Sequence, residues 1–214
     1  MANTWDPLNI HANMSLSNGD LTVDCDVAGT GQSAISEWSK SSGKWYWEMY
    51  FTKEATTYAT FGVCDASETT DFTISTRTGY NESWAYMGNN RIYHDGVTST
   101  APGHTLGSME TVQIAVDIDE GKIWFGADNT WFNSGDPAAG TDPSFEDATL
   151  IKELKACVTL RYLTDSIVTA FSLADQTYTA PTGFKALDEG TTPVAELPIE
   201  FFKHIRTNHT NLRR

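Results

Sequence analysis

The sequence predicts an all-β protein: an antiparallel β-sandwich in residues 1–188, followed by a C-terminal extension in residues 189–214. Three observations support this prediction. One segment would form a strand that is aromatic on both faces, other segments alternate between apolar and polar residues, and turn-rich stretches separate them. Many short strands joined by turns are typical of two packed sheets. A chain of 214 residues can bury one sizeable core without a second domain.

The strand predicted over residues 43–51 has the sequence Gly-Lys-Trp-Tyr-Trp-Glu-Met-Tyr-Phe. Alternate side chains of an extended chain point to opposite sides. The expected core face therefore carries Trp45, Trp47, Met49 and Phe51. The opposite face carries Lys44, Tyr46, Glu48 and Tyr50. Aromatic rings at this density suit a sheet packed against another sheet, because each ring removes a large apolar area from water.

Later elements follow from the same periodicity. Strands are predicted over residues 111–119, 156–162 and 166–173, and the first of these should point Val112, Ile114, Val116 and Ile118 inward. Turn-rich stretches lie between the predicted strands, at residues 67–71, 88–90 and 135–143. One short helix is predicted over residues 146–154, where Leu150, Ile151 and Leu154 would share a face.

Residues 43–51 resemble the Gly-Lys-Trp-Tyr-Trp-Glu strand of SPRY domains, and the flanking sequence resembles the form of that domain found in bacteriophage structural proteins. The resemblance covers about residues 3–186. Further matching segments are residues 4–7, 16–22, 61–63, 79–80, 93–96, 112–125 and 181–187, and residues 131–145 are similar to the phage form in particular. The resemblance implies a concanavalin-like antiparallel β-sandwich of the SPRY type.

One turn follows the family pattern, and three other segments depart from it. Asn18-Gly19 stands where the family has its opening hairpin, and this pair supplies the positive φ angles of a two-residue turn. Three departures each remove a glycine. Met109-Glu110 replaces the usual Gly-Asp, Asp128-Asn129 replaces Asn-Gly, and Ala-Phe-Ser at residues 170–172 replaces Asn-Phe-Gly.

The net charge of −14 is unevenly distributed. The last fourteen residues carry +4, and the preceding 200 carry −18. An acidic body repels phosphates, which argues against nucleic-acid binding. Charge alone favours a solvated tail at the basic end, but apolar residues would be wasted there. We therefore expect an assembly-docking segment, with Phe201, Phe202, Lys203, Ile205 and Arg206 as its contact residues.

The sequence predicts no catalytic site, metal site or cofactor. Asp117 with Asp119, and Asp24 with Asp26, have a glycosidase-like spacing of about 6.5 Å on one strand face, but neither pair has a third carboxylate. We interpret them as structural. The sequence has no Gly-x-Ser-x-Gly elbow and no histidines at metal-ligand spacing. Cys25, Cys64 and Cys157 are interpreted as small buried apolar residues.

Membrane insertion and export are not predicted either. The chain lacks an apolar run of about eighteen residues and the basic and apolar regions of a signal peptide. We therefore expect a protein made in the host cytoplasm, and the resemblance to the phage form implies that it is located in the virion.

What remains is a recognition surface formed by loops at one end of the sandwich, where binding groups concentrate. The expected ligand-binding or partner-binding residues are Tyr80, Trp84, Arg91, Tyr93, Trp131 and Phe132. Core roles are favoured for Tyr86 and Tyr93, which match family positions that are often structural, whereas core and binding roles are evenly balanced for Trp84 and Trp131. Aromatic side chains offer a large contact area at a small entropic cost.

The family resemblance implies a non-catalytic phage virion protein that serves attachment or adhesion in the tail or tail fibre. Its expected partners are other virion proteins and a host surface protein or glycan, and it would be oligomeric within the particle. Two alternatives stay open: a capsid decoration protein, and a carbohydrate-active enzyme on the same fold.

Overall fold

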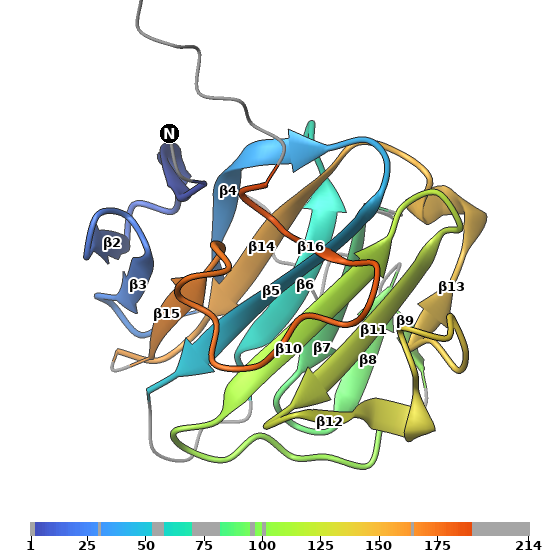
Figure 1. The fold of residues 1–214 in the computed structure, drawn as a ribbon. Helices are drawn as coiled ribbons and strands as arrows, with labels where there is room; N and C mark the ends of the chain where they lie inside the picture. The colour runs from blue at the N-terminus through green and yellow to red at the C-terminus, as the bar shows by residue number, and fades with distance from the viewer. Residues whose placement is uncertain are drawn as a thin grey trace, which may run out of the picture.

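The computed structural model describes residues 3–29, 31–52, 58–69, 82–94, 97–99, 102–163 and 165–189. These residues form two sheets that pack face to face (Figure 1). All strand pairings are antiparallel except that of the short strand β16 (Lys185–Ala186) with β5 (Lys44–Phe51). The prediction of an all-β antiparallel sandwich is therefore confirmed.

Each sheet mixes strands from distant parts of the chain. The seven-stranded sheet has the order β1 (Trp5–Ile10), β4 (Gln32–Lys40), β14 (Leu154–Leu160), β6 (Thr60–Asp65), β7 (Ser83–Met87), β8 (Arg91–His94) and β9 (Val97–Ser99). The main path of the nine-stranded sheet is β12 (Thr130–Trp131), β11 (Lys122–Ala127), β10 (Thr111–Asp117), β5, β15 (Ser166–Ala170), β3 (Thr22–Cys25) and β2 (Met14–Ser17). Outside that path, β13 (Phe145–Glu146) pairs with β11 and β16 pairs with β5.

The core lies between the two sheets. Phe51 on β5 meets Phe61 on β6 edge to face, with ring centroids 6.1 Å apart. Near one edge, the indole of Trp5 on β1 donates a hydrogen bond of 3.2 Å to the Thr169 hydroxyl on β15. Such contacts join the sheets by apolar burial and fix their relative position. The predicted core face of β5 is confirmed, because four side chains belong to this core: Trp45, Trp47, Met49 and Phe51.

The second face of β5 is also covered. Residues 171–189, here called the closing segment, run across the outer face of the nine-stranded sheet as the orange-to-red chain in Figure 1. Phe184 of this segment packs against Trp124 at 6.1 Å, in a small cluster with Tyr46. Tyr46 and Glu48 are consequently 0% and 2% exposed. Strand periodicity did not predict this second layer of packing.

Left-handed residues occupy two of the three places where glycine is lost from the family pattern. Asp128 (φ 44°) and Asn129 (φ 64°) are both left-handed between β11 and β12, so this pair performs the turn without a glycine. Met109 is left-handed as well, with φ 65°. A methionine in this region is strained relative to glycine.

The opening hairpin differs in length from the prediction. Asn18 and Gly19 do have positive φ angles, as expected. Ser17 pairs with Thr22, however, so the loop spans four residues and includes a third left-handed residue, Asp20.

The predicted helix over residues 146–154 is wrong. This part of the chain forms the end of β13, a single 3-10 turn at Ala148–Leu150 and the start of β14. Asp147 caps the 3-10 turn by accepting a hydrogen bond from the Thr149 amide at 2.8 Å. Leu150 and Leu154 are buried, but Ile151 is 54% exposed. The three apolar residues at helical spacing therefore belong to an irregular connection. Two of them, Leu150 and Leu154, attach it to the core.

Two other predictions concern the cysteines and the C-terminal extension. None of the three cysteines forms a disulfide bond and all three are buried, which confirms their interpretation as core residues. The body extends as far as Glu189, whose carbonyl accepts a 2.9 Å hydrogen bond from the Lys40 ammonium. The proposed docking residues Phe201, Phe202, Lys203, Ile205 and Arg206 lie outside the described residues.

Candidate functional site

The predicted binding residues do not form one surface. Tyr80 lies outside the described residues, Arg91 is exposed, and Trp131 is partly exposed. The other three side chains are only 0 to 9% exposed: Trp84, Tyr93 and Phe132. Burial removes them from the surface that the sequence predicted.

Packing explains why two of these rings are inside. Trp84 lies on the core-facing side of β7, where it stacks on His94 with ring centroids 4.5 Å apart. Phe132 is sandwiched between Tyr86 at 4.8 Å and His104 at 5.4 Å. The Tyr86 hydroxyl donates to the His104 carbonyl at 3.2 Å, which holds the loop before β10 over these rings. The polar residues beside these rings in the sequence belong to turns. They do not indicate that the rings are exposed.

A different group of residues is exposed at one end of the sandwich. The Arg161 guanidinium carbon lies 5.0 Å from the ring centroid of Tyr58 and 6.0 Å from that of Tyr162. The two rings are 6.1 Å apart. Tyr58 is 44% exposed and nearby Leu163 58% exposed. We call Tyr58, Arg161 and Tyr162 the Arg161 cluster.

Hydrogen bonds hold the backbone of the two cluster residues that follow β14, Arg161 and Tyr162. The Asp165 carboxylate, 1% exposed, accepts hydrogen bonds from the amides of Arg161 at 3.0 Å and Tyr162 at 2.8 Å. The Arg161 carbonyl also accepts from the Gly29 amide at 3.0 Å, which ties the β3–β4 loop to the β14–β15 loop. These bonds hold the backbone at Arg161 and Tyr162 in place in advance of any contact with a partner.

Sequence reasoning missed this cluster for an identifiable reason. Residues 156–162 were predicted as one strand, but β14 ends at Leu160. Arg161 and Tyr162 therefore belong to the loop. The available signal was Asp165, since an aspartate a few residues after a strand often binds loop amides. Tyr58 comes from a separate loop, and its proximity is visible only in the folded chain.

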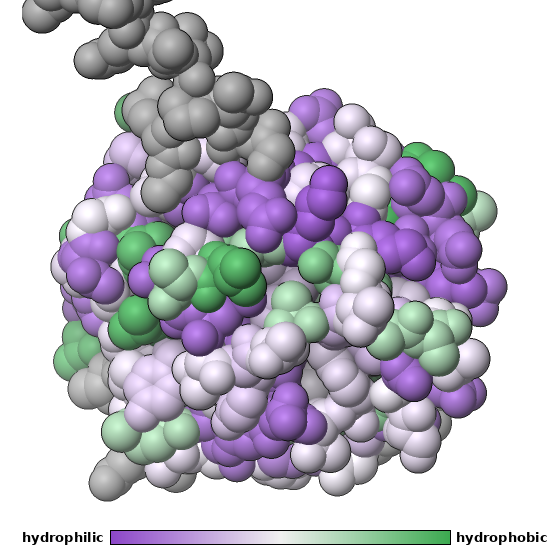
Figure 2. Space-filling model, viewed as in Figure 1, coloured by the Kyte–Doolittle hydropathy of each residue, from purple (hydrophilic) through white to green (hydrophobic). Residues whose placement is uncertain are grey.

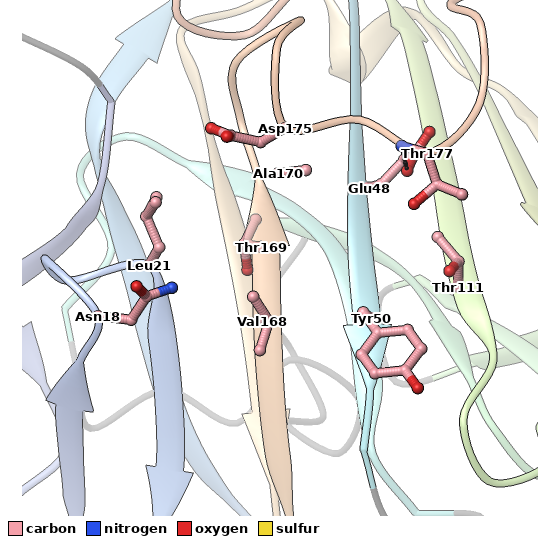
Figure 3. A pocket seen from close by; sticks show the side chains of 10 residues that line it. All are labelled: Asn18, Leu21, Glu48, Tyr50, Thr111, Val168, Thr169, Ala170, Asp175 and Thr177. Carbon is pink, nitrogen blue, oxygen red and sulfur yellow. Dashed lines mark hydrogen bonds between the residues drawn. The ribbon is translucent and has the colours of Figure 1, made fainter.

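A pocket of about 370 Å³ lies on the outer face of the nine-stranded sheet (Figure 3). We call it the outer pocket. Thr111, Tyr50 and Val168 form a row across β10, β5 and β15, because Tyr50 pairs with both of the others. The closing segment contributes Asp175 and Thr177 to the rim. The pocket thus combines an aromatic ring, hydroxyl groups and carboxylates on a rigid sheet.

Glu48 connects the outer pocket to the closing segment. Its Oε1 accepts hydrogen bonds from the Tyr46 hydroxyl at 2.7 Å and the Tyr178 amide at 2.8 Å. Its Oε2 accepts from the Thr177 amide at 2.7 Å. These hydrogen bonds offset the cost of burying the Glu48 carboxylate in the sheet.

The surroundings of the outer pocket are acidic. Burial, and then the charge of nearby Asp128, raise the pKa of the Tyr178 phenol. Burial, and then the charges of Glu189 and Asp175, raise the pKa of the Asp188 carboxyl. Figure 2 shows hydrophobic residues gathered beside the closing segment on this face, within a mainly hydrophilic surface. Leu173 of that segment is 59% exposed.

The carboxylate pairs considered for catalysis have structural contacts. Asp117 is 0% exposed, and its Oδ2 lies 2.8 Å from the Lys44 ammonium. Asp119 accepts a hydrogen bond from the Gly43 amide at 3.0 Å. Asp24 and Asp26 accept hydrogen bonds from serine hydroxyls of β2. Both pairs stabilise the strands and turns that carry them.

The described part of the chain contains neither a metal-binding group nor a membrane-spanning helix. There, no group of three or more histidine, cysteine, aspartate or glutamate side chains is placed to hold a metal ion. The same residues include no helix long and apolar enough to cross a membrane.

Comparisons with known proteins agree with this architecture. The model of the SPRY domain family matches residues 44–173, more than half of the chain. The SPRY domain of human HERC1 is similar in structure, with a TM-score of 0.62 and 19% identity over 82% of this chain and 99% of that chain. No curated protein sequence matches this chain.

Two further solved structures share the fold. The TRIM65 PSpry domain has a TM-score of 0.57 and 15% identity, over 79% of this chain and 92% of that chain. Stonustoxin has a TM-score of 0.57 and 16% identity, over 79% of this chain but 27% of that chain. At these identities the structural likeness concerns the fold alone.

Proposed function

The chain belongs to the SPRY domain family, and from this premise we propose that it is a non-catalytic module that binds a protein partner through the Arg161 cluster. SPRY domains generally mediate protein–protein interactions and are typically not catalytic. The observation that carries the proposal is the exposed placement of Arg161 beside two tyrosine rings at one end of the sandwich.

The composition and rigidity of the Arg161 cluster suit an interface. Tyrosine and arginine are enriched among the residues that dominate binding energy. A guanidinium beside aromatic rings can keep these contacts while it donates hydrogen bonds to a partner. Because Asp165 already orders the loop, binding costs less conformational entropy than it would for a loose loop.

We further propose that the module is part of a bacteriophage virion, in the tail or tail fibre, and that it is made in the host cytoplasm. The support is the similarity of residues 131–145 to the phage form of the domain. Its partners would be other virion proteins and a host surface protein or glycan. The capsid-decoration alternative predicts hundreds of copies in each purified particle, whereas a tail position predicts a few dozen or fewer.

Site-specific photo-crosslinking would test the proposed interface. A photoreactive residue at position 163, beside the Arg161 cluster, should crosslink to a specific partner in purified particles. The same group at position 8 is the control, because Leu8 is 91% exposed on a different element. Arg161→Ala should abolish the crosslink at position 163 and leave the melting temperature within a few degrees of the parent.

Two results would contradict the proposal. One is a position-163 crosslink that survives Arg161→Ala in a folded protein. The other is loss of the crosslink in Arg91→Ala alone, which would move the interface to the exposed residue of the originally predicted set.

A further inference from the structure

We propose that the outer pocket binds an arginine side chain presented by a basic partner protein. The inference rests on the proposed function in one respect only, that the occupant belongs to a protein partner. It concerns a different site, since the outer pocket lies on the face of the nine-stranded sheet and the Arg161 cluster lies in loops at its end.

Three acceptors with unused capacity line the pocket. Glu48 Oε2 accepts one hydrogen bond, from Thr177, whereas Oε1 already accepts two. Asp175 accepts from the Ser172 hydroxyl through Oδ2, at 2.8 Å. Thr111 is only 5% exposed, and its hydroxyl has no hydrogen-bond partner among the described residues. Because Thr111 lines the pocket, this hydroxyl is available to donate a hydrogen bond to a ligand or accept one from it.

The walls of the pocket suit the rest of an arginine side chain. Val168 and Leu21 offer aliphatic contact for the methylene stem. Tyr50 offers a ring beside which a guanidinium can pack (Figure 3). Among the described residues, no lysine or arginine lines the pocket, so no cation from that part of the chain neutralises its two carboxylates.

Charge and geometry favour a guanidinium over an ammonium group. A guanidinium has five donors in one plane, whereas an ammonium is a compact point charge with three donors. The acceptors come from three separate elements, β5, β10 and the closing segment, and a group with five donors can offer hydrogen bonds to more of them than a group with three. The charge of −18 over residues 1–200 also attracts a basic partner.

Titration of the full-length protein with small probes tests this inference. Backbone amide resonances are followed by NMR as the tripeptide Gly-Arg-Gly is added. Shifts should saturate and should concentrate at Tyr50, Thr111, Val168 and Thr177. The matched control is Gly-citrulline-Gly, which has nearly the same shape but no charge. It should bind at least about tenfold more weakly, because charge-assisted hydrogen bonds are about twice as strong as neutral ones.

Two substitutions locate the binding site. Asp175→Asn and Thr111→Val should each weaken Gly-Arg-Gly binding by about tenfold, the size of one lost hydrogen bond to a charged ligand. Glu146→Gln is the control, because Glu146 is exposed on β13 and does not line the pocket. Glu48 is left intact since it also holds the closing segment.

The outcomes distinguish this inference from the proposed function. Equal affinity for the citrulline peptide, or unchanged affinity in Asp175→Asn, would overturn the arginine pocket while the Arg161 crosslink could persist. Conversely, Arg161→Ala should abolish the crosslink and leave tripeptide binding unchanged.

Discussion

The phenol of Tyr46 donates a 2.7 Å hydrogen bond to Glu48, two residues further along β5 on the same outer face. Tyr46 also accepts a hydrogen bond from the Gln113 amide at 2.8 Å, and Gln113 in turn accepts from the Asn129 amide at 2.6 Å. Glu48 extends this network to the closing segment at Thr177. A single buried network therefore joins two strands, the β11–β12 turn and the closing segment.

This network predicts loss of stability at alkaline pH. Burial, and then the hydrogen bond to Glu48, raise the pKa of Tyr46 well above its ordinary value of 10.0. A group whose pKa is raised in the folded state contributes stability that is complete below the unfolded pKa and is lost as pH rises. The free energy of unfolding should therefore fall above about pH 10.

Tyr46→Phe separates the two contributions of this side chain. At pH 7 the variant should be less stable by about 1–3 kcal/mol, because Glu48 and Gln113 lose a buried partner. Above pH 10 its stability should fall less steeply than that of the parent, since the phenol is gone. Urea unfolding followed by circular dichroism between pH 7 and 11 measures both effects. A wild-type slope in Tyr46→Phe would contradict this explanation.

The left-handed backbone of Met109 predicts a stabilising substitution. Met109→Gly should raise the free energy of unfolding by about 1 kcal/mol relative to Met109→Ala, since both remove the side chain beyond Cβ but only glycine removes the steric strain. Comparing with alanine also removes the effect of losing the 3.3 Å contact from the Tyr50 hydroxyl to the Met109 sulfur. Chemical denaturation of both variants gives the difference. Equal stability would show that the strain is negligible.

The core position of Trp47 predicts a large loss of stability. Trp47→Ala should lower the free energy of unfolding by about 3–5 kcal/mol, because Trp47 is 1% exposed and its removal leaves a cavity between the sheets. Trp38→Ala is a useful comparison, since this indole is only partly buried. Thermal melts should show a much smaller shift for Trp38→Ala. Similar shifts for the two variants would contradict the facing of β5.

The ion pair of Asp117 predicts a structural defect without an enzymatic one. Asp117→Asn should lower the free energy of unfolding by about 1–3 kcal/mol, because the Lys44 ammonium loses a charged partner. We expect neither parent nor variant to release reducing sugar from host polysaccharide. Turnover by the parent that disappears in Asp117→Asn would revive the carbohydrate-active alternative.

We expect the C-terminal extension to be needed for assembly but not for folding of the sandwich. A chain that ends after Glu189 keeps the described sandwich and the hydrogen bond from Lys40. Its circular-dichroism spectrum and melting temperature should match those of the full chain, but it should be absent from purified particles. Anchoring by Phe201, Phe202 and Ile205 would bury apolar area at about 25 cal/mol per Å².

Salt dependence supplies the control for that anchoring. Attachment that depends mainly on these apolar residues should persist at 1 M salt, where the Debye length is about 3 Å. Normal incorporation of the shortened chain would show that attachment lies on the sandwich.

The sequence alone determined the features that depend on local chain geometry. A period of two is enough to assign Trp47 and Ile114 to the core face of their strands, because successive side chains must point to opposite sides of a sheet. Asn18-Gly19 likewise marks a turn, because these residues tolerate positive φ angles. The matched aromatic strand also identified the SPRY family.

Only the tertiary structure decided which faces are covered and which residues meet. Tyr46 and Glu48 alternate correctly toward the outside, yet the closing segment buries both. Trp84 was expected at the surface, but its face of β7 points between the sheets. The Arg161 cluster joins loops far apart in the chain. Such burial depends on contacts between distant segments, and a local pattern along one strand carries no information about them.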